Sequence, residues 1–287
     1  VFATWNAAFF PAGDVLLLFV VVGVVLFLTR SWSDRAIGVA AVVLLLQPVE
    51  WYHYIANLIN PAHRLPDLKV AEMYGEVADY TKAGNWRDFL LGNVTLGQKA
   101  SFLWAVNAGR FVQTAGLFLL GFFIGRKQLF MTNEKNIAFG TKVLIISAIS
   151  FAPLYTLKEL VMENDPIVQQ TVGTAFDMWQ KLAFTLVLVA SFILLYQHKN
   201  FSKAVAGLRF YGKMSLTNYI SQSIIGVFIY FPIGLNLTPY CGYTFSLLVG
   251  FLIFLLQLRF CKWWLARHKQ GPLEYIWHKC TWIGTGK

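Results

Sequence analysis

The chain has 287 residues, of which 57% are hydrophobic, 16% aromatic and only 13% charged, and its mean hydropathy is +0.55. Soluble domains carry about 25% charged residues, so this composition argues against a soluble enzyme, a disordered chain and a disulfide-built secreted domain and indicates a polytopic membrane protein. The formal net charge of +10 does not indicate a nucleic-acid partner, because the basic residues lie in alternate loops between apolar segments rather than on one solvated face.

Seven apolar segments approach the length of about 20 residues that a bilayer-spanning helix needs. In chain order they cover residues 15–29, 36–59, 102–125, 143–157, 171–197, 214–237 and 243–262. Pro153 lies in the fourth segment and Pro232 in the sixth. Spanning segments must satisfy their backbone hydrogen bonds internally, so the sequence predicts an all-α transmembrane bundle of about seven spans, forming a single domain over residues 1–287.

Two polar pieces accompany these segments. Residues 60–101 place apolar side chains at helical spacing after two prolines, which predicts short amphipathic helices over the outer mouth of the bundle. A solvated connector without a role is the alternative for this piece. Residues 263–287 mix four tryptophans with basic residues, which is typical of a cytoplasmic amphipathic tail at the membrane interface.

The distribution of Lys and Arg among the loops predicts the orientation. One set of loops, together with the tail, carries sixteen basic residues, and the opposite set carries six. Cytoplasmic loops are the ones enriched in Lys and Arg. We therefore expect the Val1 end outside, the C-terminus in the cytoplasm and the lipid bilayer as the partner of the apolar surface. The alternation also supports the fourth segment, because its removal would place basic loops on both sides.

Ionisable residues inside the apolar segments are the most informative feature of the sequence. Each costs at least about 2.5–3.5 kcal/mol to insert, so such residues face the interior and pair. Those at a similar outer depth are Asp14, Glu50, Arg110, Asp177 and Lys181. We infer one polar cavity open to the outside, in which Asp14, Arg110, Asp177 and Lys181 bind substrate. The alternative is a set of structural ion pairs, such as Asp177 with Lys181 one helical turn away.

Two residues are candidates for proton transfer. Glu50 and His53 lie at the outer end of the second segment, and an imidazole beside a carboxylate can act as a base. The alternative for His53 is an interfacial aromatic side chain. In the sixth segment, Asn218 and Gln222 belong to a polar stripe in the cytoplasmic half, which predicts either interhelical hydrogen bonds or a substrate-facing pocket.

The sequence carries no further catalytic or metal signal. Cys241, Cys261 and Cys280 are far apart and form neither a disulfide framework nor a metal-spaced set, so no metal site is expected. No HExxH, GxSxG or P-loop pattern occurs. The chain begins at Val1 without a signal sequence before its first apolar segment, and we expect it to be part of a longer protein.

Four stretches resemble a known family. They are PAGDVLLLF at 11–19, AGLFLLGFFIGR at 115–126, GKMSLTNYISQSIIG at 212–226 and GPLEYIWHKCTW at 271–282. In this order they are similar to motifs of the YeiB-like bacterial inner-membrane proteins, a family with a domain of unknown function. The chain departs from the pattern at His278 and Lys279, near the family's usual Arg. Members carry about three further spans upstream, which this chain is expected to lack.

The resemblance implies a tentative chemistry and a location in the inner membrane. YeiB-like proteins look distantly related to multi-pass acyltransferases such as the lysosomal heparan glucosaminide acetyltransferase, which take an acyl group from cytoplasmic acyl-coenzyme A. No tightly bound cofactor is implied. The catalytic His of those enzymes would lie upstream of Val1, so that role does not pass to His53. Fold-level analogy says little about chemistry, and three hypotheses stay open: an acyltransferase acting on an envelope component or lipid, a transporter or channel for a small polar or anionic solute, and a non-catalytic membrane partner.

Overall fold

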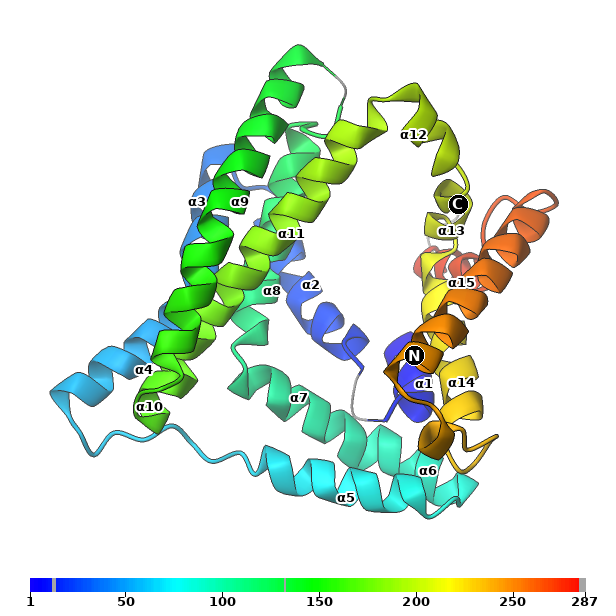
Figure 1. The fold of residues 1–287 in the computed structure, drawn as a ribbon, viewed down its shortest axis with the longest axis horizontal. Helices are drawn as coiled ribbons and strands as arrows, with labels where there is room; N and C mark the ends of the chain where they lie inside the picture. Colours follow the sequence, from blue (N-terminus) through cyan, green and yellow to red (C-terminus); the bar gives the residue numbers. More distant parts are fainter. Residues whose placement is uncertain (12–13, 132, 284–287) are drawn as a thin grey trace. The chain divides into compact units, whose positions relative to one another are not determined.

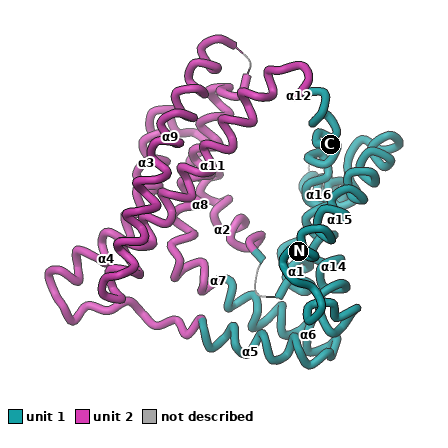
Figure 2. Tube along the Cα trace, viewed as in Figure 1, with its two compact units in different colours: residues 1–14, 71–101, 202–287 teal, residues 15–70, 102–201 magenta. Residues whose placement is uncertain are grey.

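The computed structural model describes residues 1–11, 14–131 and 133–283, and every regular element in these ranges is a helix, which confirms the all-α fold class. The chain divides into two compact units (Figure 2). Unit 1 consists of Val1–Asp14, Ala71–Ser101 and Ser202–Lys287, and unit 2 consists of Val15–Val70 and Phe102–Phe201. The single transmembrane domain expected from the sequence stays a prediction.

The helices of unit 2 are labelled in Figure 1. They are α2 (Leu16–Thr29), α3 (Asp34–Leu45), α4 (Pro48–Ile59), α8 (Arg110–Arg126), α9 (Glu134–Val161), the short α10 (Pro166–Val168), a π-helical turn (Gln169–Gly173) and α11 (Thr174–Tyr196). The helices of unit 1 are α1 (Phe2–Phe9), α5 (Val70–Lys82), α6 (Trp86–Gly92), a π-helical turn (Asn93–Gly97), α13 (Leu208–Gly212), α14 (Ser215–Tyr230), a 3₁₀ turn (Thr238–Tyr240), α15 (Tyr243–Leu265) and α16 (Pro272–Thr281). Helices α7 (Gln98–Asn107) and α12 (Lys199–Ala204) run across the unit boundaries.

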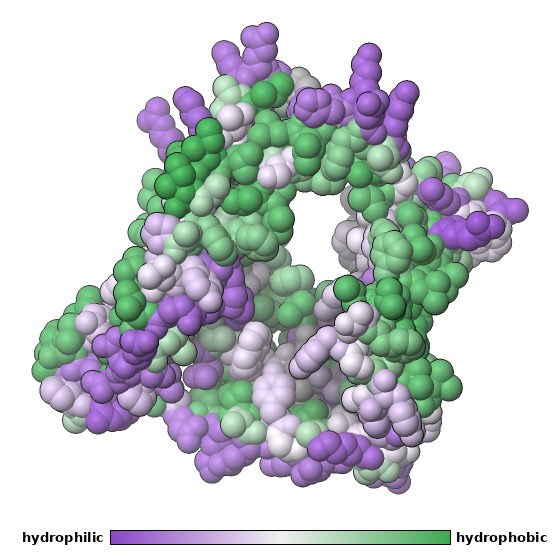
Figure 3. Space-filling view, in the orientation of Figure 1, coloured by the Kyte–Doolittle hydropathy of each residue, from purple (hydrophilic) through white to green (hydrophobic). Residues whose placement is uncertain are grey.

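Three helices are long and apolar enough to cross a membrane alone, namely α9, α11 together with its preceding turns from Pro166, and α15. Helix α9 is 28 residues long, contains Pro153 and reaches beyond the predicted apolar segment at both ends, and the side chain of Asn133 caps its first turn. Helices α9 and α11 lie side by side (Figure 1). Figure 3 shows an apolar surface over the middle of this pair and hydrophilic residues toward its ends, as a bilayer requires.

Two further candidate spans each consist of two helices with a sharp bend between them. Helices α3 and α4 bend by 47° at Leu46–Gln47, and the helical stretch Trp86–Asn107 bends by 76° from α8 at Ala108–Gly109. Counting each bent pair as one span gives up to five spans in the described residues, so the predicted count of seven is not confirmed. The first and sixth predicted segments form α2 and α14, of 14 and 16 residues, which rise only about 21–24 Å against a hydrocarbon core of about 30 Å.

Unit 2 is held together at one end by Arg126, which lies at the end of α8. Its guanidinium donates to the backbone oxygens of Arg30 (2.6 Å) and Trp32 (2.7 Å) and pairs with Asp34 (3.3 Å). These contacts satisfy carbonyl groups at the C-terminal end of α2, where a cation is favourable. Helices α2, α3 and α8 are thereby fixed at their shared end.

The interior of unit 2 depends on close packing between α3 and α8. Ile37, Ala41 and Leu119 form a buried cluster with at most 1% of each side chain exposed. A Cβ atom at Gly116 would lie 2.9 Å from a side-chain carbon of Leu45, so only glycine allows the two helices to approach this closely. The packing places the C-terminal end of α3 beside the first turns of α8.

Candidate functional site

A polar pocket of about 400 Å³ opens in unit 2 at the predicted outer ends of its helices. Helices α7, α8, α9 and α11 and the turn Gln169–Gly173 supply its walls. Its charged lining residues are Arg110, Lys158, Asp177 and Lys181, and its other lining residues are Trp104, Ala108, Met162, Gln169, Gln170, Gly173, Thr174 and Met178. Three of the six residues proposed from the sequence to bind substrate therefore line one pocket: Arg110, Asp177 and Lys181.

Arg110 is the first residue of α8 and has no acidic partner among the described residues. Its Nη1 donates to Gln113 Oε1 (3.0 Å) and contacts the sulfur of Met178 (3.7 Å), while its guanidinium lies 5.5 Å from the ring centre of Trp104. The Nε–H is buried and makes no hydrogen bond. A structural ion pair of Arg110 with Asp177 or Glu50, which the similar depth of these residues would allow, is therefore absent from the part of the chain that the structure describes.

The Asp177 carboxylate instead forms ion pairs with two lysines. Lys181 Nζ lies 2.5 Å from one carboxylate oxygen, which is the pairing that their spacing of four residues predicts, and Lys158 Nζ lies 3.3 Å from the other. The side chains are 21% exposed for Asp177, 26% for Lys158 and 49% for Lys181, so the three groups remain within reach of solvent. One carboxylate against three cations leaves the pocket with an excess of positive charge.

Lys158 is a pocket residue that the sequence analysis missed. The apolar pattern of the fourth segment ends at Leu157, which predicts that Lys158 lies in an outer loop. Helix α9 instead continues to Val161 and brings the Lys158 ammonium to Asp177. The sequence does contain a signal for this longer helix, because no turn-forming residue lies between Thr156 and Val161.

The two helix breaks lie next to each other, and Ala108 and Arg110, the neighbours of Gly109 in the chain, line the pocket. Gln47, at the end of α3, has a left-handed backbone with φ of +58°, and Pro48 begins α4. Gly109, between α7 and α8, has φ of +62°. A Cβ atom at Gly109 would lie 2.8 Å from Glu50 Oε1 and 3.5 Å from Gln47 Oε1, so glycine is needed both for the backbone conformation and for the close approach.

His53 makes a different contact from the one that its position beside Glu50 suggested. Its Nδ1 lies 3.1 Å from Nε2 of His63, and the two rings stack with centres 5.4 Å apart. Asn57 supports His63 by donating to its backbone oxygen (3.0 Å). The catalytic roles proposed for Glu50 and His53 stay predictions.

Asp14 belongs to unit 1. Its Oδ1 accepts from Asn6, a fully buried residue whose own side-chain oxygen accepts from Ser223 (2.7 Å), and its backbone oxygen accepts from Ser101 (3.1 Å). This hydrogen-bonded chain ties together three segments that are distant in sequence. A substrate-binding role for Asp14 stays a prediction.

Asn218 and Gln222 lie in a hydrogen-bonded network within unit 1. Gln257 on α15 accepts from Tyr211 (2.9 Å) and from Gln222 (3.0 Å), while its amide donates to Ser221 (2.8 Å). Asn218, only 2% exposed, contacts the buried sulfur of Cys261 (3.3 Å). Burial, together with the nearby Cys261, raises the pKa of the Tyr211 phenol. These contacts are the interhelical hydrogen bonds that the sequence predicts, and substrate binding by Asn218 and Gln222 stays untested.

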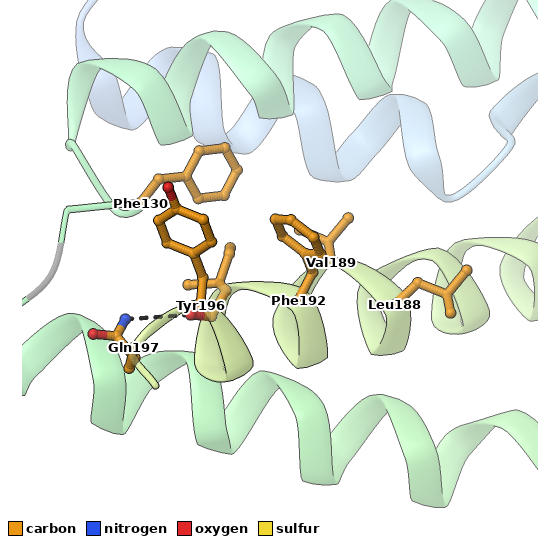
Figure 4. Close-up of a pocket in the computed structure, with 7 residues that line it drawn as sticks. Phe130, Leu188, Val189, Phe192, Tyr196 and Gln197 are labelled. Atoms are coloured by element: carbon orange, nitrogen blue, oxygen red, sulfur yellow. Dashed lines mark hydrogen bonds between the residues drawn. The ribbon is translucent and has the colours of Figure 1, made fainter. Parts of the chain in front are cut away.

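Unit 2 also contains an apolar pocket of about 640 Å³ at its predicted cytoplasmic end. Figure 4 shows Phe130 beside Tyr196, with Phe192, Val189 and Leu188 following along α11. The amide of Gln197 donates to the backbone of its own helix at Ile193 (3.3 Å). The pocket has the size and the apolar lining that suit a hydrocarbon chain.

Among the described residues no group of three His, Cys, Asp or Glu side chains could hold a metal ion.

Curated proteins with similar sequences match only part of the chain. YxaH of Bacillus subtilis is 26% identical over 95 residues, a 39.9 kDa protein in the amylase 3' region of Bacillus acidopullulyticus is 35% identical over 91 residues, and YeiB of Escherichia coli is 31% identical over 81 residues. These stretches cover 33%, 31% and 28% of this chain, and 24%, 25% and 20% of the relatives' own lengths. All three relatives are described as uncharacterized, and the matches span a quarter or less of each. No solved structure matches the chain.

A family assignment rests on a longer match. The family described as "Protein of unknown function (DUF418)" matches residues 124–284, which is more than half of the chain. The match extends from the end of α8 to the end of the C-terminal helix and includes two of the four stretches that resemble YeiB-like proteins. Together with the similarity to YeiB it confirms the resemblance found in the sequence, and the chain belongs to the YeiB-like DUF418 family.

Proposed function

We propose that this membrane protein binds a small anionic solute, a carboxylate or a phosphate, in the pocket beside Arg110 and carries it across the membrane. The observation that supports the proposal is the Arg110 guanidinium, which faces a polar pocket without an acidic partner and with its Nε–H unsatisfied. A guanidinium stays charged at any physiological pH, and its planar donors match a carboxylate or phosphate in a bidentate manner. An anion would supply the missing partner.

The surroundings of Arg110 strengthen the preference for an anion. Lys158 and Lys181 add two ammonium groups, against the single carboxylate of Asp177. Arg110 also begins α8, and the N-terminus of a helix carries partial positive charge that favours an anion. Lys181, which is about half exposed, can rotate toward a ligand at small cost, because exposed pairs contribute about 0–1 kcal/mol, whereas Lys158 is more buried and also lies 3.8 Å from Glu159.

The lining of the pocket fits transport of a solute better than catalysis. The only carboxylate among the described lining residues, Asp177, already accepts two lysines and is poorly placed to act as a base. Transporters commonly bind substrate where spanning helices are interrupted, with helix N-termini directed at anionic groups. The α3–α4 break at Gln47 and the α7–α8 break at Gly109 provide two such interruptions beside the pocket. By the loop charges, the pocket would open to the outside of a bacterial inner membrane.

Uptake into proteoliposomes tests this proposal. The full chain would be reconstituted and offered radiolabelled phosphate, acetate, succinate and glycerol phosphate, each against unlabelled competitor. We expect uptake of at least one of these anions, and a fall in initial rate of about tenfold or more in Arg110→Gln, since a charge-assisted hydrogen bond contributes about 1.5–3 kcal/mol. The matched control is Arg87→Gln, which removes an exposed arginine and should leave the rate unchanged. Equal rates in the wild type and Arg110→Gln would contradict the proposal.

A second candidate function is acyl transfer, and the apolar pocket of Figure 4 favours it. Its volume of about 640 Å³ and its lining by Phe130, Phe192 and Tyr196 suit the hydrocarbon part of an acyl donor. The YeiB-like resemblance implies acyl-coenzyme A as that donor, and the predicted cytoplasmic position of the pocket agrees. Purified protein given acyl-coenzyme A with a labelled acyl group should then form labelled lipid or glycan acceptor in membranes. Release of no coenzyme A and labelling of no acceptor would reject this function and leave transport.

A further inference from the structure

The breaks of the two bent spans enclose a second group of polar side chains, separate from the anion pocket. We infer that Glu50 and Gln47 bind a monovalent cation of the size of Na⁺ behind Gly109. The inference goes beyond the proposed anion binding, because the Glu50 and Gln47 side chains do not line that pocket.

Glu50 is a buried carboxylate without a partner. It is 6% exposed, and it forms no ion pair and no side-chain hydrogen bond with any described residue. A carboxylate in such a place costs several kcal/mol unless a positive charge or a proton compensates it. Its position in the first turn of α4 provides only the partial charge of the helix N-terminus. The site therefore needs a compensating positive charge, which either a bound cation or a proton would supply.

Gln47 supplies an independent observation at the same place. It is 1% exposed, and both its amide oxygen and its amide nitrogen lack hydrogen-bond partners. Buried amides are almost always hydrogen-bonded, so an unpartnered one points to a ligand or ion. Gln47 also carries a left-handed backbone, a conformation that costs a residue with a side chain about 1–2 kcal/mol, and this backbone holds its amide between the ends of α3 and α4.

Two acceptor oxygens, one from Glu50 and one from Gln47, lie close to the same position. Glu50 Oε1 and Gln47 Oε1 are 2.8 and 3.5 Å from the place that a Cβ atom on Gly109 would take. A proton on Glu50 would let it donate to Gln47 Oε1, whereas a cation would be bound by both oxygens, and Na⁺ stabilises only the second arrangement. Interrupted helices also direct their negative C-terminal ends at such a place, and coupling ions bind there in other membrane proteins. Here α3 ends at Leu45 and α7 at Asn107.

Neighbouring residues hold the break in shape. Trp179 on α11 donates from its indole to the backbone oxygen of Leu45 (2.8 Å), which satisfies one carbonyl at the end of α3. The methyl carbon Cγ2 of Thr174 lies 3.5 Å from the place that a Cβ atom on Gly109 would take. The cation site is therefore enclosed by α3, α4, α8 and α11 within unit 2.

Thermal unfolding in Na⁺ and in choline tests the inference. The full chain in lipid nanodiscs would be heated in sodium chloride or choline chloride at equal ionic strength and pH 7, with chloride as the only anion, so that the result is independent of anion binding at Arg110. At a Na⁺ concentration of ten times Kd we expect Tm to rise by about 3 °C over choline. Glu50→Gln should fold with a Tm no lower than the wild type in choline and should lose the response to Na⁺.

Two further variants keep the test decisive. Gln47→Asn tolerates the left-handed backbone but withdraws the amide oxygen by one carbon, so it should reduce the Na⁺ response even where Glu50→Gln does not fold. Glu159→Gln, which changes an exposed acid on α9, should keep the full response. Equal Tm values of the wild type in Na⁺ and choline would overturn the inference. Stabilisation by acid alone, without a Na⁺ effect, would overturn it in favour of a protonated Glu50.

Discussion

Replacing Arg110 by Gln separates a ligand-binding arginine from a structural one. A buried ion pair that loses one partner costs about 3–5 kcal/mol. Arg110 has no acidic partner among the described residues, and its substitution removes one hydrogen bond to Gln113 while also removing a partly buried, incompletely satisfied cation. We therefore expect Arg110→Gln to change the free energy of unfolding by no more than about 1–2 kcal/mol, which is a shift in Tm of a few degrees.

The ligand response should change far more than the stability. An anion that stabilises the wild type against heating should bind Arg110→Gln about 10- to 100-fold more weakly, which corresponds to the loss of a charge-assisted pair. The assay is thermal unfolding of detergent-purified protein titrated with phosphate, carboxylates and sulfate. A loss of 3 kcal/mol or more, recovered in part by adding Asp177→Asn, would refute the reasoning and establish a structural pair.

Further substitutions test neighbouring features. Asp177→Asn frees Lys158 and Lys181 for a ligand and should tighten anion binding by about two- to fivefold in the same titration; weaker binding would show that Asp177 itself contacts the ligand. Gly109→Ala should lower stability by about 1–2 kcal/mol in thermal unfolding, because φ is +62°, and an unchanged Tm would argue against the helix break. Gln257→Leu removes the side-chain acceptor of the half-buried Tyr211 and the exposed Gln222, and by the same measurement should cost about 0.5–1.5 kcal/mol; an unchanged Tm would show that the network contributes nothing.

The fold class and the shared pocket were accessible from the sequence for physical reasons. Apolar segments of helix length can satisfy their backbone in a bilayer only as helices, which led directly to the all-α prediction. Charged residues inside such segments must face other protein or water, and Arg110, Asp177 and Lys181 do line one pocket. The pairing of Asp177 with Lys181 follows from their spacing on α11.

Other features depend on contacts that no local pattern encodes. Hydropathy marks only the apolar middle of α9, so its polar ends, and with them Lys158, fell outside the predicted span. Pro48 and Gly109 permit a helix break, but whether the breaks at the two positions meet depends on the packing of α3 against α8. The lack of an acid beside Arg110 is likewise a property of the folded chain, since Asp177 and Glu50 were both plausible partners by depth.

The central claim is that an anion binds beside the Arg110 guanidinium. Its most direct test is an experimental structure of the full chain in selenate, with anomalous scattering used to locate selenium. We predict a selenium peak in the pocket, with selenate oxygens about 2.7–3.0 Å from the Arg110 nitrogens and with Lys158 or Lys181 turned toward it. A structure in which Arg110 pairs with a carboxylate of the protein and the pocket binds no selenate would contradict the account.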